Sequence, residues 1–335
     1  MTHQPQAALM LDIESTTLST EDRHILRQRE VCGVILFARN IEHPEQVKEL
    51  CAAIRTVRPD LLLAVDQEGG RVQRLREGFV RLPPMRSLLE CGANSELLAQ
   101  QCGFLMASEV LAVGLDFSFA PVLDLDYGAS EVIGDRAFAT SPGEVTKLAA
   151  AFIQGMNEAG MAACGKHFPG HGYVRADSHL ALPVDTRSLE QIRQSCLQPF
   201  IQLAPSLAAV MPAHVVYPQV DEQPAGFSRR WLQDILRGEL NFNGLIFSDD
   251  LTMQGAACVG DLRARTEASL AAGSDVALVC NDRASAEQAL ICLQQRKAAP
   301  PTQRLAAMRG RRLAADVAAQ KHKACAALRE AGLIA

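Results

Sequence analysis

Short apolar runs alternate along the chain with longer segments in which apolar residues recur at helical spacing. Eight of these runs have the length of a buried strand, and most of them end in a polar or charged residue or are followed directly by one. The predicted strands are Ala7–Ile13, Cys32–Phe37, Leu61–Asp66, Phe117–Leu123, Ala162–His167, Leu207–Pro212, Gly244–Asp249 and Asp275–Cys280. An eightfold alternation of strand and helix predicts an α/β protein, a parallel (β/α)8 barrel of the TIM type.

Amphipathic segments between the strands predict the helices that surround such a barrel. They are Pro44–Val57, Gly143–Ala159, Ser188–Leu203, Arg230–Leu240 and Ala284–Gln294. The alternative is a doubly wound open sheet, which would need fewer strands and a phosphate-binding glycine fingerprint at its first turn. The sequence has no such fingerprint, and this favours the barrel.

The domain organisation follows from the same pattern. We expect residues 1–335 to form a single barrel domain, because no low-complexity segment or linker divides the chain. The tail, about residues 303–333, is rich in Ala, Arg and Leu. It predicts C-terminal helices that pack on the outside of the barrel.

Composition narrows the class of protein. The 335 residues carry a net charge of −5, and 48% of them are hydrophobic, so the chain can bury a large core but has no basic face for nucleic acid. We find no signal peptide and no apolar stretch long enough to cross a membrane. Ten cysteines without CxxC pairs indicate reduced thiols. We therefore expect a cytoplasmic protein that binds neither nucleic acid nor membrane.

Titratable residues gather where the predicted strands end. Asp66, Asp124, Lys166, His167 and Asp249 lie at the ends of strands three, four, five and seven. In a (β/α)8 barrel these ends lie on one face, and that face holds the active site. The sequence therefore predicts a reaction site there.

The segment GLIFSDDL, residues 244–251, runs from a buried strand directly into two carboxylates. A carboxylate in that position is costly to desolvate unless it has partners or a chemical task. We expect Asp249 to face the barrel axis as a catalytic group and Asp250 to cap the next helix.

The loop KHFPGHGYVRADSH, residues 166–179, is dense in titratable groups. Asp177 and His179 are one residue apart, and a carboxylate beside an imidazole suits proton transfer near neutral pH. Two other interpretations are a surface salt bridge and a zinc site. The H-x3-H-x7-H spacing is unusual for zinc and a lysine adjoins the first histidine, so we expect no metal.

The segment VDQEGGRVQR, residues 65–74, alternates acids and arginines that can hydrogen-bond hydroxyl groups. Asp66 is favoured as a ligand-binding group. The alternative interpretation is a salt-bridge network that closes the top of the barrel. His214, in MPAHVVYP, is either a supporting group or a ligand contact. With 5% aromatic residues, a pocket for one or two sugars is favoured over a long polysaccharide groove.

Five motifs together carry a family resemblance: KHFPGHGYVRADSH, VDQEGGRVQR, IGDRAF, MPAHVVYP and GLIFSDDLTMQGA. The chain resembles the bacterial, cytoplasmic, single-domain β-N-acetylglucosaminidases of glycoside hydrolase family 3 from about Ala8 to Asn281. The resemblance implies a barrel enzyme of peptidoglycan recycling, monomeric and without cofactor or metal. Its substrates would be muropeptides and GlcNAc-containing disaccharides, above all N-acetylglucosaminyl-1,6-anhydro-N-acetylmuramic acid with or without its peptide.

The resemblance also implies roles for individual residues. Asp249 would be the nucleophile of a retaining double displacement, and His179, paired with Asp177, the general acid/base. The −1 sugar subsite would consist of Asp66, Arg74, Arg136, Lys166 and His167. We expect Gly170 and Gly172 to let the loop that carries His179 move inward.

Several alternatives stay open. The 2-acetamido group of the substrate can act as the nucleophile in place of Asp249, as in substrate-assisted glycosidases. A histidine acid/base also tolerates phosphate, so phosphorolysis is a second variant. From other classes, a metal-dependent barrel hydrolase and a non-catalytic muropeptide sensor are the rival functions.

Overall fold

The computed structural model describes residues 6–174, 182–311 and 316–335. Eight parallel strands form one sheet in the order β6-β3-β2-β1-β12-β11-β8-β7. They are β1 (Ala8–Leu11), β2 (Val31–Leu36), β3 (Leu62–Val65), β6 (Phe117–Ser118), β7 (Cys164–Phe168), β8 (Ala209–Pro212), β11 (Leu245–Asp250) and β12 (Val276–Val279). The two end strands of this order approach each other through a bridge between Val122 and Lys166, so the sheet is a nearly closed barrel.

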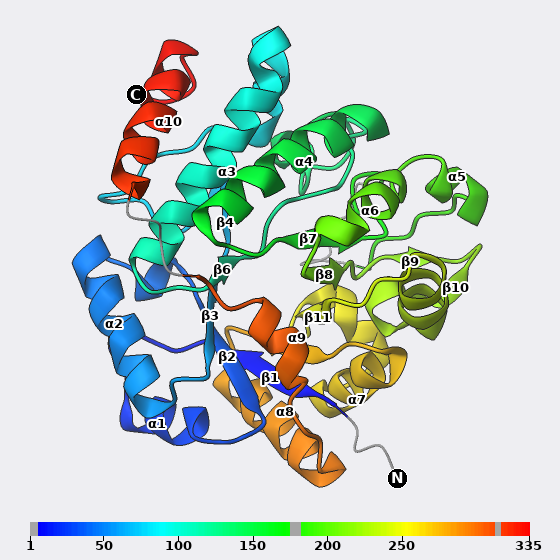
Figure 1. Ribbon diagram of the computed structural model, residues 1–335. Coiled ribbons are helices and arrows are strands. Elements are labelled where there is room, and N and C mark those ends of the chain that lie inside the picture. The colour runs from blue at the N-terminus through cyan, green and yellow to red at the C-terminus, as the bar shows by residue number, and fades with distance from the viewer. Residues whose placement is uncertain (1–5, 175–181, 312–315) are drawn as a thin grey trace.

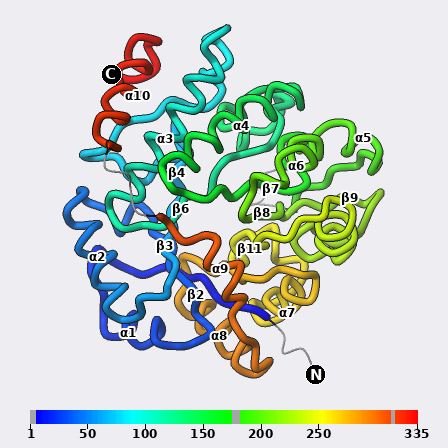
Figure 2. The backbone as a smooth tube through the Cα atoms, viewed as in Figure 1, coloured from blue at the N-terminus to red at the C-terminus, as the bar shows by residue number. Residues whose placement is uncertain are grey.

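The barrel confirms the predicted (β/α)8 fold, and each predicted strand overlaps an observed one. Strand β1 pairs in parallel with β12, so the first strand of the chain lies beside the last. In Figure 2 the blue start of the chain lies beside the orange segment that contains α8. The fourth strand is shorter than predicted, because only Phe117 and Ser118 pair in the sheet. Pro121 has no backbone N–H to donate, and after it only Val122 bridges to a neighbouring strand. Strand β3 ends at Val65, so Asp66 lies one residue beyond the strand.

Helices cover the outside of the barrel (Figure 1). The α-helices before the tail are α1 (Thr20–Leu26), α2 (Pro44–Val57), α3 (Ser95–Ala112), α4 (Pro142–Ala159), α5 (Leu189–Arg193), α6 (Gln198–Leu203), α7 (Leu262–Ala272) and α8 (Arg283–Arg296), and η6 (Arg230–Glu239) is a π-helix. The single helix predicted over Ser188–Leu203 is wrong, because α5 and α6 are separate.

Helix α3 has no counterpart among the predicted helices. It packs against α4 on one side and the C-terminal helix α10 (Val317–Glu330) on another, so apolar residues cover nearly its whole circumference. A helix buried in this way has no polar stripe, and a search for amphipathic periodicity misses it.

Short elements connect the barrel units. The 3-10 helices are η1 (Ala38–Asn40), η2 (Met85–Asn94), η3 (Gly134–Arg136), η4 (Ala204–Ser206), η5 (Ala225–Phe227) and η7 (Gln254–Val259). Two small antiparallel pairs join β4 (Gln67–Gly69) to β5 (Val72–Gln73) and β9 (Val216–Tyr217) to β10 (Asp221–Pro224).

The interior of the barrel is packed with aromatic rings. Phe117, Phe119 and Phe247 come from opposite sides of the barrel, and their ring centroids lie 5.0 to 5.7 Å apart. All three side chains are fully buried. The barrel is therefore a filled core, and ligands bind at its end.

The tail contains α9 (Thr302–Ala307) and α10. Arg304 bonds Asp275 at 2.6 Å, and Lys321 of α10 bonds Glu109 of α3 at 3.2 Å. These ion pairs hold the tail on the outside of the barrel. None of the described helices has both the length and the apolar composition that crossing a bilayer requires. All ten cysteines are free thiols, as expected.

Candidate active site

A cavity of about 740 Å³ opens at the carboxyl ends of the barrel strands. Seven of the eight strands, or the residues that follow them, contribute to its wall. Lining residues from these strand ends are Phe37, Asp66, Phe119, Lys166, Met211, Asp249 and Cys280. The predicted reaction face is therefore hollow, and one cavity contains Asp249 and all five predicted sugar-binding residues.

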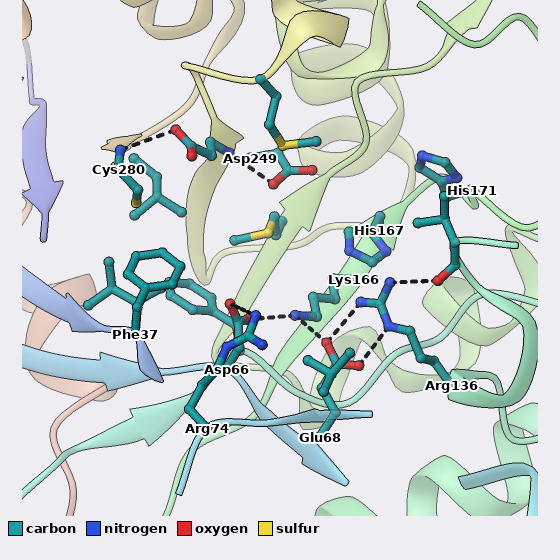
Figure 3. Close-up of a pocket in the computed structure, with 18 of the residues that line it drawn as sticks. Phe37, Asp66, Glu68, Arg74, Arg136, Lys166, His167, His171, Asp249 and Cys280 are labelled. Carbon is teal, nitrogen blue, oxygen red and sulfur yellow. Dashed lines mark hydrogen bonds and ion pairs between the residues drawn. The ribbon is translucent and has the colours of Figure 1, made fainter. Parts of the chain in front are cut away.

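One wall of the cavity is a network of ion pairs (Figure 3). Lys166 Nζ lies 2.9 Å from Asp66 Oδ1 and 2.6 Å from Glu68 Oε1. Arg136 donates two hydrogen bonds to Glu68, from Nε at 2.8 Å and from Nη2 at 2.9 Å. Arg74 lies beside Asp66, with Nη2 3.8 Å from Oδ2. The salt-bridge network expected of the VDQEGGRVQR segment is present, and its residues also line the cavity. The ligand-binding role of Asp66 stays a prediction.

The charges of this network support one another. Burial alone would raise the pKa of Glu68, but Arg136 and Lys166 outweigh it and hold that pKa well below its usual range. Burial alone would lower the pKa of Lys166, but Asp66 and Glu68 raise it. Both groups stay charged at neutral pH. The wall can therefore offer charge-assisted hydrogen bonds to the hydroxyl groups of a sugar.

His167 is fixed from behind by a buried carboxylate. Its Nδ1 lies 2.7 Å from Asp124 Oδ2, and Asp124 also accepts the backbone N–H of His171 at 2.6 Å. Burial would raise the pKa of Asp124, but His167 and His171 lower it, so this group is a carboxylate. A carboxylate only accepts, so Nδ1 of His167 carries the proton. The peptide bond between Lys166 and His167 is cis.

His171 also lines the cavity. Burial, followed by the charge of His167, lowers its pKa to about 4. The imidazole is therefore neutral at physiological pH. Together with His167 it forms an imidazole pair, with ring centroids 5.9 Å apart, beside the ion-pair wall.

Asp249 faces the cavity from the end of β11 (Figure 3). Its Oδ1 accepts the backbone N–H of Asp250 at 2.8 Å. The prediction that Asp250 caps a helix is wrong, because its carboxylate instead accepts the N–H groups of Thr252 and Cys280. Those bonds tie the end of β11 to the end of β12. Burial raises the pKa of Asp250 to about 6.

Asp177 and His179 lie outside the described residues, so their acid/base roles stay predictions. The two glycines earlier in the loop have a packing role. A Cβ atom on Gly172 would lie 1.7 Å from Leu125 O, and one on Gly170 would lie 2.3 Å from the Cβ of Cys196. Close approach to these neighbours therefore requires glycine at both positions, whether or not the loop moves.

A metal centre has little support in the described part of the chain. No group of three or more His, Cys, Asp or Glu side chains is placed there to hold a metal ion. His167 is instead engaged with Asp124.

Two residues that organise the site had no predicted role. Glu68 connects Arg136 to Lys166, and Asp124 holds His167. Asp124 carried a signal, since it lies at a predicted strand end. Glu68 had only a weaker one, as one of two acids in a short charged segment.

The comparison with known families decides the class of protein. The model of the glycosyl hydrolase family 3 N-terminal domain matches residues 6–314. The chain belongs to glycoside hydrolase family 3. It is a glycoside hydrolase, and the family is the one that the motifs predicted.

Its relatives agree with this assignment. A β-hexosaminidase of Pseudomonas aeruginosa (strain PAO1) is 65% identical over 332 residues, which cover 98% of this chain and 99% of the relative. A β-hexosaminidase of Idiomarina loihiensis is 58% identical over 287 residues, which cover 85% of this chain and 87% of the relative. Among solved structures, NagZ from Neisseria gonorrhoeae in complex with N-trifluoroacetyl-D-glucosamine superposes with a TM-score of 0.87 at 41% identity. That match covers 97% of this chain and 99% of NagZ.

Proposed function

We propose that this enzyme is a retaining exo-β-N-acetylglucosaminidase. It removes non-reducing terminal GlcNAc from peptidoglycan fragments, chiefly GlcNAc-1,6-anhydroMurNAc with or without peptide, as a cytoplasmic monomer in cell-wall recycling. The names of its β-hexosaminidase relatives and the N-acylated glucosamine bound to the similar NagZ support the sugar specificity.

One observation carries the proposal. The carboxylate of Asp249 and the ion-pair wall face the same cavity. The −1 subsite consists of Asp66, Arg74, Arg136, Lys166 and His167. A sugar whose hydroxyl groups bond this wall presents its anomeric carbon to Asp249. The 740 Å³ cavity suits a terminal sugar better than an extended polymer.

The chemistry proceeds in two displacements. Asp249 attacks the anomeric carbon while the bond to the leaving oxygen breaks and His179 donates a proton to that oxygen. His179 then takes a proton from water, and the water oxygen displaces Asp249 to release GlcNAc with retained configuration. Asp177 stabilises the imidazolium that donates the proton in the first step and that forms again in the second. A histidine acid/base places no second anion beside Asp249.

The first test uses an aryl N-acetyl-β-D-glucosaminide in the presence of a chelator, with wild type and Asp249→Ala compared. We expect chromogen release by the wild type alone. Activity that disappears in chelator would favour a metal-dependent hydrolase, and silence in both proteins would favour a binding protein.

A second test separates the nucleophiles. A slow 5-fluoro-GlcNAc donor should leave a glycosyl adduct on the peptide that contains Asp249, detected by mass spectrometry. Retention of configuration without any adduct would indicate attack by the 2-acetamido group instead. Release of GlcNAc 1-phosphate in phosphate buffer would indicate phosphorolysis.

A further inference from the structure

His214 lies behind the cavity, two residues after β8 ends. Its side chain is fully buried. The imidazole stacks on Phe227, with ring centroids 5.3 Å apart and planes inclined by 7°. A Cβ atom added to Gly226 would lie 3.5 Å from Nδ1, so the backbone of η5 also borders the ring. The orientation of the imidazole is therefore set by its packing.

The buried ring makes a polar contact with the end of β11. His214 Nε2 lies 3.1 Å from the backbone oxygen of Asp250. A carbonyl oxygen only accepts, so Nε2 carries a proton and donates it. The same oxygen accepts the N–H of Met253 at 3.1 Å. Two donors thus hold this carbonyl in place.

The residue that His214 holds, Asp250, also contacts Asp249. The N–H of Asp250 donates to Asp249 Oδ1 at 2.8 Å, while its carboxylate is held by the N–H groups of Thr252 and Cys280. The backbone of Asp250 is therefore fixed at its carbonyl by His214 and points its N–H at the carboxylate of Asp249. A connected path runs from the buried imidazole to the Asp249 carboxylate, which lines the cavity.

We propose that His214 is a positioning residue that fixes the aim of the Asp249 carboxylate through the backbone of Asp250. This inference rests on the proposed role of Asp249 as nucleophile. Because displacement of a reacting group by about 1 Å can cost on the order of 100-fold in rate, loss of the Nε2 donor acts on the chemical step. The ion-pair wall that binds the sugar has its own restraints, so binding is spared.

Two amide variants distinguish the loss of the Nε2 hydrogen-bond donor from the loss of the volume of the His214 ring. In His214→Gln the side-chain amide nitrogen reaches the position of Nε2, whereas in His214→Asn it reaches only the position of Nδ1. We expect His214→Asn to lower kcat by about 10- to 100-fold, with KM and the inhibition constant of GlcNAc within about twofold of wild type. His214→Gln should stay within about threefold of the wild-type kcat.

The control is Leu328→Ala, which removes buried volume from α10 in the C-terminal tail. It should lower the melting temperature without lowering kcat. The inference is wrong if His214→Asn keeps a kcat within twofold of wild type. It is equally wrong if His214→Gln loses as much as His214→Asn, or if kcat and GlcNAc binding weaken together.

A measurement on the wild type needs no folded variant. In protein labelled with 15N-histidine, long-range 1H–15N spectra report which ring nitrogen of each histidine is protonated. The signals of His214 are the ones missing from the His214→Gln spectrum. If that variant does not fold, sequential assignment identifies them. We expect protonation at Nε2, and a proton on Nδ1 alone would overturn the inference.

The activity of Asp249→Ala is measured in parallel. If that variant stays active the proposed mechanism fails, whereas an inactive Asp249→Ala with a fully active His214→Asn refutes only the role of His214.

Discussion

Glu68 and Arg136 form a two-point ion pair in the ion-pair wall of the cavity. Both oxygens of the carboxylate accept from the guanidinium, at 2.8 and 2.9 Å, and Lys166 Nζ lies 2.6 Å from one of them. The Glu68 side chain is only 4% exposed. Two buried cations therefore share this buried anion, and Asp66 is the second carboxylate beside Lys166.

Glu68→Gln should destabilise the enzyme and weaken sugar binding together. The substitution leaves Arg136 and Lys166 buried with one compensating charge fewer, and removing one partner of a buried ion pair costs about 3–5 kcal/mol. Urea unfolding measures the loss, and the inhibition constant of GlcNAc measures binding. The matched control is Glu96→Gln, which breaks an exposed pair with Lys147 and should cost less than about 1 kcal/mol. Equal losses in the two variants would contradict the central role of Glu68.

The polar residues at the ends of the predicted strands indicated where most of this site lies. Two of these residues, Lys166 and His167, lie near the end of the buried strand β7, and Asp249 lies near the end of β11. Parallel strands bring their carboxyl ends to one face of a barrel. The partners of these groups were harder to predict. Glu68 reaches Arg136 across 68 positions of the chain, and only the closed barrel makes that pair.

Predictions from local sequence patterns were wrong where contacts between distant parts of the chain determine the structure. Helix α3 lacks a polar face because it lies between other helices. Asp250 looks like a helix cap in the sequence, yet it binds the N–H group of Cys280 from the neighbouring strand end. In both cases the competing partner is distant in sequence, and no local motif encodes it.

Gly172→Ala should reduce both stability and activity. Its new Cβ would lie 1.7 Å from Leu125 O, a distance that forces the backbone of one segment to move. Overpacking of this kind costs typically about 1–3 kcal/mol, and the displaced segment follows His171 directly. The melting temperature and the kcat on an aryl glycoside measure the two effects. Gly143→Ala serves as the control, because no atom lies within 4 Å of its added Cβ. A Gly172→Ala enzyme as stable and active as Gly143→Ala would refute the packing role.

His179→Ala should affect substrates according to their leaving groups. An activated aryl leaving group departs with little proton donation, whereas a sugar leaving group needs it. We expect a loss of about 100-fold or more on a muropeptide or disaccharide and a much smaller first-step loss on an activated aryl glycoside. Pre-steady-state release of the aryl group measures the first step. Asp249→Ala is the comparison, because removal of the nucleophile harms both substrates alike. Equal losses on both substrates in His179→Ala would count against the acid role.

Asp250 gives the enzyme a specific dependence of stability on pH. Burial raises the folded-state pKa from 3.8 to about 6, so between these values the folded protein binds more protons than the unfolded chain. Its contribution to stability therefore falls as the pH rises through this window, by on the order of 2 kcal/mol in total.

Asp250→Asn keeps an oxygen that accepts from Thr252 and Cys280 but has no proton to lose. The free energy of unfolding of this variant, minus that of wild type, should increase from pH 4 to pH 7. Urea unfolding at intervals of one pH unit measures this difference. Asp234→Asn, at an exposed position on η6, should show a difference that stays constant over the same range. A flat difference for Asp250→Asn as well would mean that Asp250 is ionised throughout, and that the end of β11 carries two full negative charges side by side.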